Sequence, residues 1–253
     1  MVERDGGGSV LRGREEDGGG VEEGLPPLPR IGATGWEAGP NFRGPTAKSN
    51  WVVPGRVLAG AYPASRDDEI HERLMSALVE GAGVTMFVCL MNEVDPARDA
   101  GRWRDSERFF RPYMEDARRA ARRAGRREPA WLQLRVEDGT PGGSGEMEAF
   151  LADYVVPHIL AGEHEEGDNS SGGGVVYVHC RMGNGRTGVA CASLLGMLYP
   201  SLSCDACLTR LQLYHGARKV APDLPTPQTS RQRDAVAEIL AIHRQRRAGL
   251  ASP

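Results

Sequence analysis

The stretch that most constrains the fold is residues 175–198, VVYVHCRMGNGRTGVACASLLGML. It begins with apolar, β-branched residues, which are typical of a buried parallel strand, and it ends in an apolar pattern that predicts a helix. A glycine-rich turn joins the two. Because the first N–H groups of a helix have no partner within the helix, such a turn is suited to bind an anion. The stretch therefore predicts an α/β protein with an anion-binding loop between this strand and this helix.

The rest of the chain fits the same fold class. Short apolar runs at 83–91 and 131–136 predict two further strands, and residues 52–58 around a Pro-Gly pair predict a short hairpin or edge strand. The arginine-rich residues 101–127 are expected to be mostly helical, with an interruption at Pro112. Helical patterns also occur at 65–81, 146–160, 187–199, 204–216 and 229–246. Strands that alternate with helices predict a single α/β domain with a central, mostly parallel sheet flanked by helices.

The amino-terminal residues differ from the rest in composition. Residues 1 to about 30 are rich in Gly and Glu, with only scattered apolar side chains, so they are predicted to be disordered. The residues that follow suit an extended lead-in. We therefore expect a disordered or extended segment at 1–45 and a folded domain at 46–248.

Composition excludes several classes of protein. The formal net charge of −3 and the 6% content of aromatic residues argue against a nucleic-acid-binding protein. No apolar run is long enough for a transmembrane helix, and the amino end lacks the features of a secretory signal, so a cytoplasmic or nuclear protein is expected. The five cysteines are unevenly spaced and predict no disulfide framework. Cys204 and Cys207 have no second pair to complete a zinc site, and we expect them to lie in a helix.

The glycines of the turn allow two interpretations. Gly183, Gly185 and Gly188 match the dinucleotide-binding fingerprint G-x-G-x-x-G, which also lies between a strand and a helix. That fingerprint requires a second strand, with an acidic residue at its end about twenty residues on. Only helical patterns follow here, and Asp205, near the required spacing, lies in no strand pattern. The dinucleotide interpretation is therefore disfavoured.

Cys180 and Arg186 support a different chemistry. Cys180 follows the predicted strand directly and precedes a helix, whose dipole favours a negatively charged thiolate. Arg186 can donate two parallel hydrogen bonds to phosphate oxygens, Thr187 can donate one to the sulfur, and His179 either fixes the loop through backbone groups or is simply packed. The flexible glycine backbone can curl around a tetrahedral anion. The predicted phosphate-binding residues are Arg181, Met182, Gly183, Asn184 and Gly185.

The run HCRMGNGRTG resembles the His-Cys-x5-Arg-Thr/Ser-Gly signature of the cysteine-based protein tyrosine phosphatases. The length and pattern of the chain look more like the compact dual-specificity branch than like the larger receptor-type domains, and the resemblance covers roughly residues 48–246. It implies a phosphatase fold in which Cys180, Arg186 and Thr187 are catalytic. It also implies a phosphocysteine intermediate and no metal ion or other cofactor.

The resemblance assigns roles to two more loops. In the family an Asp on a mobile loop after a core strand protonates the leaving oxygen, and here WLQLRVEDGTPGG contains Asp138, 42 positions before Cys180. Glu137 is the rival for this role, and Asp138 could also be a plain turn residue. The run PQTSRQRDAV resembles the glutamine loop that positions the hydrolytic water, which would assign that task to Gln228. Thr229 could equally make this segment a helix N-cap.

These assignments lead to one expected function and two alternatives. The first is a protein phosphatase that hydrolyses phosphotyrosine, and also phosphoserine or phosphothreonine, in a phosphorylated protein. The second is a phosphatase for a phosphoinositide, an inositol phosphate or an RNA 5′ end. The third is a non-catalytic module that binds phosphoproteins, which would be expected to lack Cys180, Arg186 or Asp138.

Three further features carry weaker expectations. Asn92 and Glu93 follow a predicted strand and would lie at the pocket rim. Cys89 is expected to be buried, with a resolving thiol for oxidised Cys180 as the less favoured reading. In residues 101–127 arginine outnumbers Asp and Glu, which indicates either a solvated helical face or a basic surface for anionic partners.

Overall fold

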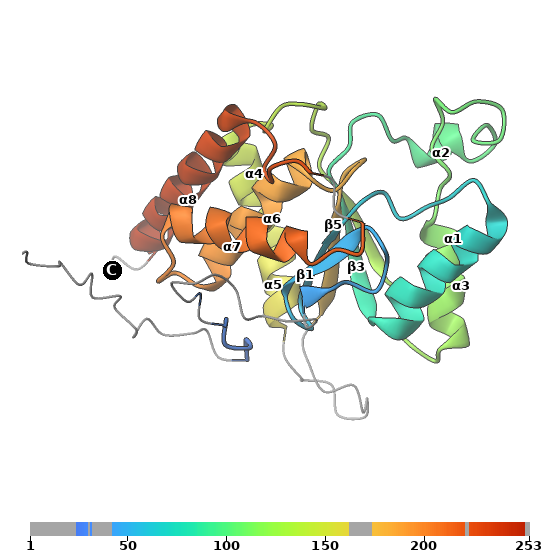
Figure 1. The fold of residues 1–253 in the computed structure, drawn as a ribbon, viewed down its shortest axis with the longest axis horizontal. Helices are drawn as coiled ribbons and strands as arrows, with labels where there is room; N and C mark the ends of the chain where they lie inside the picture. Colours follow the sequence, from blue (N-terminus) through green and yellow to red (C-terminus); the bar gives the residue numbers. More distant parts are fainter. Residues whose placement is uncertain (1–23, 30, 32–41, 162–173, 221–222, 251–253) are drawn as a thin grey trace, which may run out of the picture.

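The computed structural model describes residues 24–29, 31, 42–161, 174–220 and 223–250. Its centre is a five-stranded sheet in the order β1-β2-β5-β3-β4 (Figure 1). Only β1 and β2 pair antiparallel, as the predicted hairpin requires, and the other neighbours are parallel. The mostly parallel sheet predicted from the sequence is therefore confirmed. The strands are β1 (Ser49–Val53), β2 (Val57–Gly60), β3 (Val84–Cys89), β4 (Ala130–Gln133) and β5 (Val175–His179).

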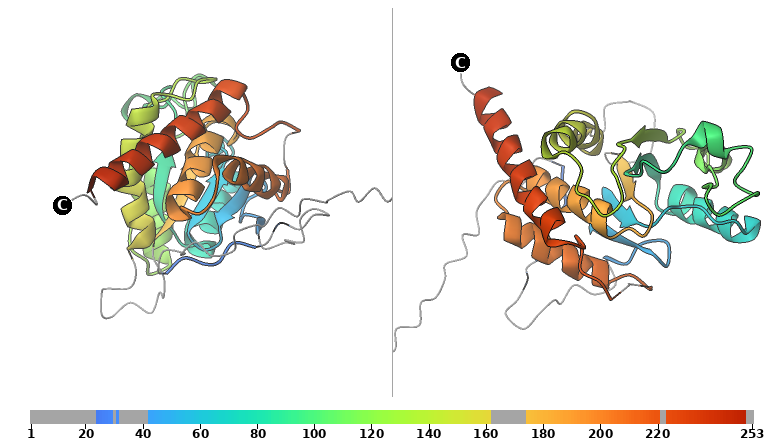
Figure 2. Two further views of the ribbon diagram at one scale, coloured as in Figure 1. Left: turned by 90° about the vertical axis from the view of Figure 1, so that its left-hand side faces the viewer. Right: turned by 90° about the horizontal axis from the view of Figure 1, so that it is seen from above.

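Helices cover both faces of the sheet. α1 and α3 lie on one side in Figure 1, and α4 to α8 form a larger layer on the other. The further views show that α8 crosses the outside of this larger layer, where it packs on α4 and α6 (Figure 2). π-helical turns continue α1 at Ser76–Gly81 and join α4 to α5 at Leu151–Val155. The helices are α1 (Asp68–Met75), α2 (Pro96–Asp99), α3 (Met114–Arg123), α4 (Ser144–Phe150), α5 (Val156–Leu160), α6 (Gly185–Leu198), α7 (Cys204–Gly216) and α8 (Ser230–Leu250).

The two faces of β5 belong to two apolar cores. Val176 and Val178 point into the larger core, which α4 to α8 cover, whereas Tyr177 points into the smaller core beneath α1 and α3. Alternate side chains of a strand point to opposite faces, so a strand buried on both sides must be apolar throughout. α6 is buried along its whole length, because it lies between the sheet and α8. This burial fixes the loop that joins β5 to α6.

The arginine-rich segment departs from the sequence prediction. Residues 101–127 were expected to be mostly helical, but α3 occupies only Met114–Arg123, and residues 101–109 form turns. Pro112 precedes α3, as the predicted interruption requires. Before it, the guanidinium of Arg102 lies over the ring of Phe109, and those of Arg104 and Arg111 lie over Trp103. These cation–π contacts between side chains stabilise a compact loop where the sequence pattern suggested a helix.

Part of the predicted amino-terminal tail contacts the domain. Leu25 is buried in the larger core, Tyr199 donates a hydrogen bond of 2.7 Å to the carbonyl of Pro26, and Arg210 donates one to Pro29. Residues 1–23, 30, 32–41, 162–173, 221–222 and 251–253 lie outside the described part of the chain. Domain limits of 1–45 and 46–248 therefore stay a prediction. Among the described helices none is long and apolar enough to cross a membrane.

Candidate active site

The predicted site residues meet at one edge of the sheet. Cys180 directly follows β5, the central strand, and the chain then enters α6. The neighbouring strands β3 and β4 end at the same edge, where they lead to Glu93 and Asp138. In parallel α/β sheets, ligands bind at the carboxyl ends of the strands for this reason. The expectation that Glu93 lies at this edge is confirmed.

The loop after β5 encloses the Cys180 sulfur. Cys180 is 4% exposed, and the backbone N–H of Gly183 donates to its Sγ at 3.2 Å. Gly183 has a φ of +79°, and a Cβ there would lie 2.5 Å from the carbonyl carbon of Gly60 on β2. Glycine is therefore required at this position, both for the left-handed conformation and for the close approach to β2. The hydrogen bond expected from Thr187 to the sulfur is not formed, because the buried Thr187 hydroxyl has no hydrogen-bond partner among the described residues.

The start of α6 is open to a ligand. Asn184 is the N-cap residue, but its side chain makes no capping hydrogen bond. Its Oδ1 instead accepts from His215 Nε2 at 2.9 Å, behind the loop. The first N–H groups of α6 are thus left without a side-chain cap, which suits an anion at the positive end of the helix dipole. Asn184 contributes to the predicted phosphate loop through its backbone rather than through its amide.

The Arg186 guanidinium is held by two acidic side chains. Its Nη1 and Nη2 donate to the two carboxylate oxygens of Glu93 at 2.8 and 2.9 Å. Nη1 also donates to the carbonyl of Val136 at 3.0 Å, and Nη2 lies 2.8 Å from Asp138 Oδ1. Only Nε, which is buried, has no partner among the described residues. Arg186 is 1% exposed, and a bidentate pair of this kind fixes both the position and the plane of the guanidinium.

The ion pair between Arg186 and Glu93 also affects the ionisation of the Glu93 carboxyl. Burial opposes ionisation of the Glu93 carboxyl, but the hydrogen bonds and charge of Arg186, a backbone hydrogen bond and the charge of Arg181 together hold the pKa of Glu93 below its usual value. Glu93 therefore stays a carboxylate at neutral pH and continues to hold Arg186. The sequence placed Glu93 only at the pocket rim. Its role as the partner of Arg186 could not be predicted, because the two residues are 93 positions apart.

The loop after β4 brings Asp138, rather than Glu137, to the site. The Asp138 carboxylate lies against Arg186 while its side chain is 71% exposed, so it faces both the loop and solvent. The Glu137 side chain makes no hydrogen bond or ion pair with any residue that the structure describes. The loop is closed on itself by Thr140, whose hydroxyl donates to the Glu137 carbonyl at 2.9 Å. The arrangement favours Asp138 as the acid, and the assignment stays a prediction.

The glutamine segment forms a helix cap and a link between loops. Thr229 and Gln232 make a reciprocal capping box: Gln232 N donates to Thr229 Oγ1, and Thr229 N donates to Gln232 Oε1. Gln232 Nε2 also donates to the carbonyl of Thr140 in the acid loop at 3.2 Å. The N-cap reading is therefore confirmed. Gln228 is exposed and donates its backbone N–H to Gln232 Oε1, and its water-positioning role stays a prediction.

A buried polar network supports the phosphate loop from behind. Arg218, which is 5% exposed, donates to Asn50 Oδ1 at 2.7 Å and to the carbonyl of Gly183 at 2.9 Å. It also reaches Asn184 Oδ1, which His215 binds as well. All three acceptors are uncharged, and burial lowers the pKa of Arg218. No sequence pattern indicated this role, because a lone arginine that follows a helix resembles any surface cation.

His179 is a structural part of the site in this arrangement. It is fully buried, and burial lowers the pKa of its imidazole to about 3, so the ring is neutral. The Tyr113 hydroxyl lies 2.6 Å from His179 Nε2, and Trp131 Nε1 donates to the same hydroxyl. With a neutral ring, Tyr113 donates to Nε2, and Nδ1–H points at the Cys180 carbonyl, 3.4 Å away. The expected contact between His179 and the loop backbone is thus confirmed.

The remaining predicted residues lie at the surface of the loop. The side chains of Arg181 and Met182 are exposed, and both residues line a neighbouring pocket. Cys89 is buried, as expected, and burial raises the pKa of its thiol to about 12. Cys204 and Cys207 lie in α7, as predicted. Within the described residues, no group of three or more His, Cys, Asp or Glu side chains is placed to hold a metal ion.

Comparison with known proteins finds sequence similarity to a protein described as a phosphatase. No protein-family model matches the chain. A protein of Invertebrate iridescent virus 3 named "Putative tyrosine phosphatase 067L" is 32% identical over 90 residues, which are 36% of this chain and 34% of the viral protein. The aligned part thus spans about a third of the length of this relative. The chain is similar there to a protein described as a tyrosine phosphatase.

Solved structures with a similar fold are also phosphatases. PTPMT1 in complex with PI(5)P is 16% identical, with a TM-score of 0.49, over 79% of this chain and 98% of that chain. The core catalytic domain of the PP-IP phosphatase SIW14 from S. cerevisiae is 12% identical, with a TM-score of 0.49, over 82% and 93%. Tk-PTP in its active form is 15% identical, with a TM-score of 0.47, over 77% and 97%. The predicted resemblance to tyrosine phosphatases agrees with the description of the viral relative.

Proposed function

We propose that the chain is a cysteine-dependent phosphatase that hydrolyses phosphotyrosine, and also phosphoserine or phosphothreonine, in a phosphorylated protein. The observation that carries this proposal is the convergence of three side chains at one sheet edge. Cys180 lies in a loop that presents backbone N–H groups, Arg186 is fixed beside it, and Asp138 contacts Arg186. A nucleophile, a phosphate-binding cation and a proton donor are the groups that phosphoester cleavage by a thiolate requires.

In the first step the Cys180 thiolate attacks the phosphorus atom. An S–P bond forms, the P–O bond to the substrate breaks, and Asp138, which takes up a proton from solvent once it leaves Arg186, gives that proton to the leaving oxygen. The loop N–H groups and Arg186 stabilise the charge on the three equatorial oxygens. In the second step Asp138 accepts a proton from water, the water oxygen bonds to phosphorus, and the S–P bond breaks. The products are the free hydroxyl compound and inorganic phosphate.

The contacts of Arg186 support a specific exchange when phosphate enters. Nε has no partner among the described residues and is free to donate to one phosphate oxygen. Nη2 lies 2.8 Å from Asp138 Oδ1, and a phosphate oxygen would replace that carboxylate. Glu93 meanwhile keeps both Nη atoms in place. Asp138 is then released toward the leaving oxygen, so substrate binding and placement of the acid are coupled.

The test uses p-nitrophenyl phosphate and phenyl phosphate in buffer that contains a metal chelator. The wild-type chain should hydrolyse both, and Cys180→Ser should hydrolyse neither. Asp138→Asn should lower kcat for phenyl phosphate by about 10²–10⁴-fold, and less for the nitrophenyl ester, whose better leaving group needs no acid.

Glu137→Gln is the matched control for Asp138→Asn, because it changes the adjacent carboxylate in the same loop. It should leave both rates within about twofold of wild type. Hydrolysis by Cys180→Ser at the wild-type rate would overturn the proposal. A large loss in Glu137→Gln with little loss in Asp138→Asn would move the acid role to Glu137.

A further inference from the structure

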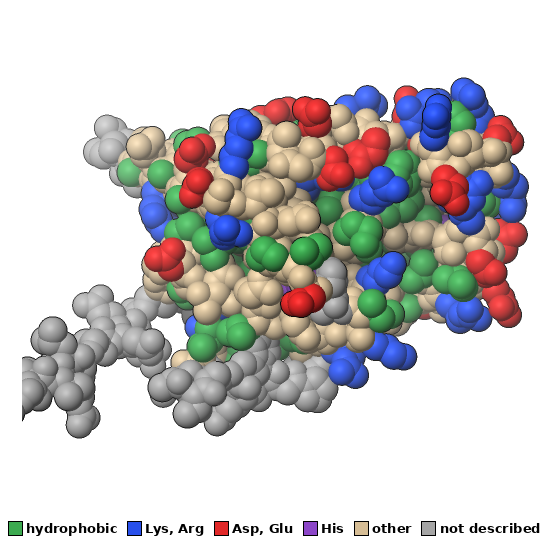
Figure 3. Space-filling view, turned by 45° about the horizontal axis from the view of Figure 1, so that its top comes forward, with side chains coloured by type: hydrophobic (Ala, Val, Ile, Leu, Met, Phe, Trp, Pro, Cys, Tyr) green, Lys and Arg blue, Asp and Glu red, His purple; other side chains and the backbone are tan. Residues whose placement is uncertain are grey.

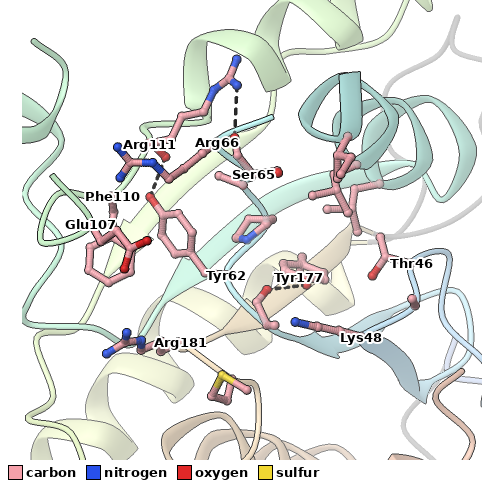
Figure 4. Close-up of a pocket in the computed structure, with 18 of the residues that line it drawn as sticks. Thr46, Lys48, Tyr62, Ser65, Arg66, Glu107, Phe110, Arg111, Tyr177 and Arg181 are labelled. Carbon is pink, nitrogen blue, oxygen red and sulfur yellow. Dashed lines mark hydrogen bonds between the residues drawn. The ribbon is translucent and has the colours of Figure 1, made fainter. Parts of the chain in front are cut away.

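A second recess lies beside the phosphate loop. It has a volume of about 530 Å³ and is bounded on the loop side by Arg181 and Met182, which directly follow Cys180. Neither Cys180 nor Arg186 lines it. Tyr177 of β5 lies at its floor, and Tyr62, just after β2, forms part of its wall (Figure 4). A molecule bound through a phosphate at Cys180 could therefore extend into this recess over Met182.

Most of the lining is apolar. Three aliphatic side chains of α1 and its continuation, Ile70, Leu74 and Leu78, form one wall, and Phe109 and Phe110 belong to another. Ile70 is 44% exposed and Met182 is 53% exposed, so two large apolar side chains face solvent at this recess. Exposed apolar surface that is gathered in a concave site indicates a binding site for an apolar group.

Two cationic side chains that line the recess form no hydrogen bond or ion pair within the described part of the chain. Lys48, just before β1, and Arg181 are exposed, and neither side chain has a hydrogen-bond or ion-pair partner among the described residues. Arg66 and Arg111, which also line the recess, differ: Arg66 donates to the carbonyls of Arg104 and Ser106, and Arg111 to that of Ser65. Arg66 and Arg111 therefore stabilise the wall of the recess, whereas the side chains of Lys48 and Arg181 are available to bind an anion.

We propose that this recess binds the residues that flank the phosphorylated residue of a peptide substrate, with an apolar side chain against Ile70 and an acidic side chain near Lys48 and Arg181. The proposal rests on the proposed phosphatase function and names its substrate class. The combination of apolar walls and unpaired cations fits neither a purely apolar nor a purely acidic partner.

The position of the recess favours a polypeptide. The occupant must be covalently joined to the phosphate group at Cys180, and the recess begins at the next two residues of the same loop. An extended peptide advances about 3.3 Å per residue and points alternate side chains the same way. Neighbours one to three residues from the phosphorylated residue therefore reach the recess. A phosphoinositide would instead place its acyl chains at a membrane surface rather than in a recess of the protein.

The first part of the test compares substrates of the wild-type chain. Four phosphotyrosine peptides carry Leu plus Glu, Leu alone, Glu alone, or only Ser and Gly around the phosphotyrosine. A dioctanoyl phosphoinositide and p-nitrophenyl phosphate are assayed beside them. The kcat/KM for the Leu-plus-Glu peptide should exceed that for the Ser/Gly peptide by about tenfold or more, with intermediate values for the two single-feature peptides.

The second part uses variants of the recess. Ile70→Glu should remove the preference for Leu, and Lys48→Glu should remove or reverse the preference for Glu, while each leaves the rate with p-nitrophenyl phosphate unchanged. The matched controls are Leu250→Glu, an exposed leucine on α8, and Arg127→Glu, an exposed arginine just before β4 at the opposite edge of the sheet. Both controls should keep the wild-type preferences.

The outcomes separate this inference from the proposed function. Equal kcat/KM for the four peptides, with good hydrolysis of each, would overturn the inference and leave the phosphatase function intact. A phosphoinositide that is hydrolysed with a higher kcat/KM than every peptide would also overturn it. No hydrolysis of any substrate would contradict the proposed function itself. Preferences that survive in both recess variants would show that the recess is not where the flanking residues bind.

Discussion

Arginines of the catalytic edge and arginines of residues 101–127 are used in opposite ways. Arg186 and Arg218 are almost completely buried, and each holds named backbone and side-chain groups of the site. In α3, by contrast, Arg122 is half exposed and pairs with Glu115 and Glu128 at the surface. Figure 3 shows Lys/Arg and Asp/Glu side chains intermingled at the end of the molecule where α1, α2 and α3 lie.

This difference shows that local density of arginine is a poor guide to function. The segment with the most arginines neutralises them with acids from neighbouring elements, such as Glu72 and Glu80 for Arg123. That pattern supports the solvated-face interpretation over a basic surface for anionic partners. A buried guanidinium is costly to desolvate, so it persists only where its geometry is needed. The isolated arginines of the site meet that condition.

Among the variants that test this contrast between arginines, Arg186→Lys is expected to have the largest effect. Lysine keeps the charge but offers no planar pair of donors, so it can hold neither Glu93 nor two phosphate oxygens in the same way. We expect kcat for p-nitrophenyl phosphate to fall by about 10²–10³-fold, as for the loss of one donor to a developing negative charge.

The control for Arg186→Lys is Glu93→Gln, which leaves the arginine but weakens its bidentate support. It should lose activity by a smaller factor and raise KM. Circular dichroism and urea unfolding check that both variants are folded. A loss of less than about tenfold in Arg186→Lys would mean that charge alone, rather than geometry, is what the site needs from this residue.

Arg218→Met should act on stability more than on chemistry. The change removes a donor from Asn50, Asn184 and the Gly183 carbonyl, and buried acceptors without partners cost about 1–3 kcal/mol each, although such costs are not additive. We expect the free energy of unfolding, measured with urea, to fall by about 3 kcal/mol. Loss of activity should be smaller than in Arg186→Lys, since Arg218 reaches the phosphate loop only from behind.

Arg218→Lys distinguishes charge from geometry at this second buried site. A single ammonium can reach one of the three acceptors, so it should recover only part of the stability. An unfolding free energy of Arg218→Met within about 1 kcal/mol of wild type would show that the network behind the loop is dispensable.

Much of the fold could be predicted because its signals are local. The run at 175–178 is apolar, as a strand buried on both faces requires, and with His179 it forms β5. The start of α6 was also placed within two residues. In the arginine-rich segment, α3 follows Pro112, but helix before Pro112 was a wrong prediction, because the structure there is stabilised by contacts such as Arg102 over Phe109, which no helical periodicity reveals.

The residues of the site likewise divide into those that a local sequence pattern predicts and those that it does not. Cys180, Arg186 and the predicted phosphate loop lie within seven consecutive residues, so their placement around one loop could be predicted from the sequence. Glu93, Arg218 and Gln232 act across large separations in the chain, and no sequence pattern indicated the partners that they contact. Their roles follow from the strand order and from the packing of α7 and α8, which place them against the loops.

The smallest effect is expected for Arg122→Ala, which removes both surface pairs with Glu115 and Glu128. Water and dissolved ions screen exposed charges, and the long side chains lose rotamer freedom when they pair, so such pairs contribute little. Thermal unfolding should shift Tm by less than about 2 °C, and kcat/KM for p-nitrophenyl phosphate should stay at the wild-type value. In about 1 M NaCl, where screening extends over only about 3 Å, the remaining difference in Tm should vanish. A fall of more than about 5 °C, or any loss of activity, would mean that the arginine-rich end supports the catalytic edge after all, and the contrast between the two sets of arginines would no longer hold.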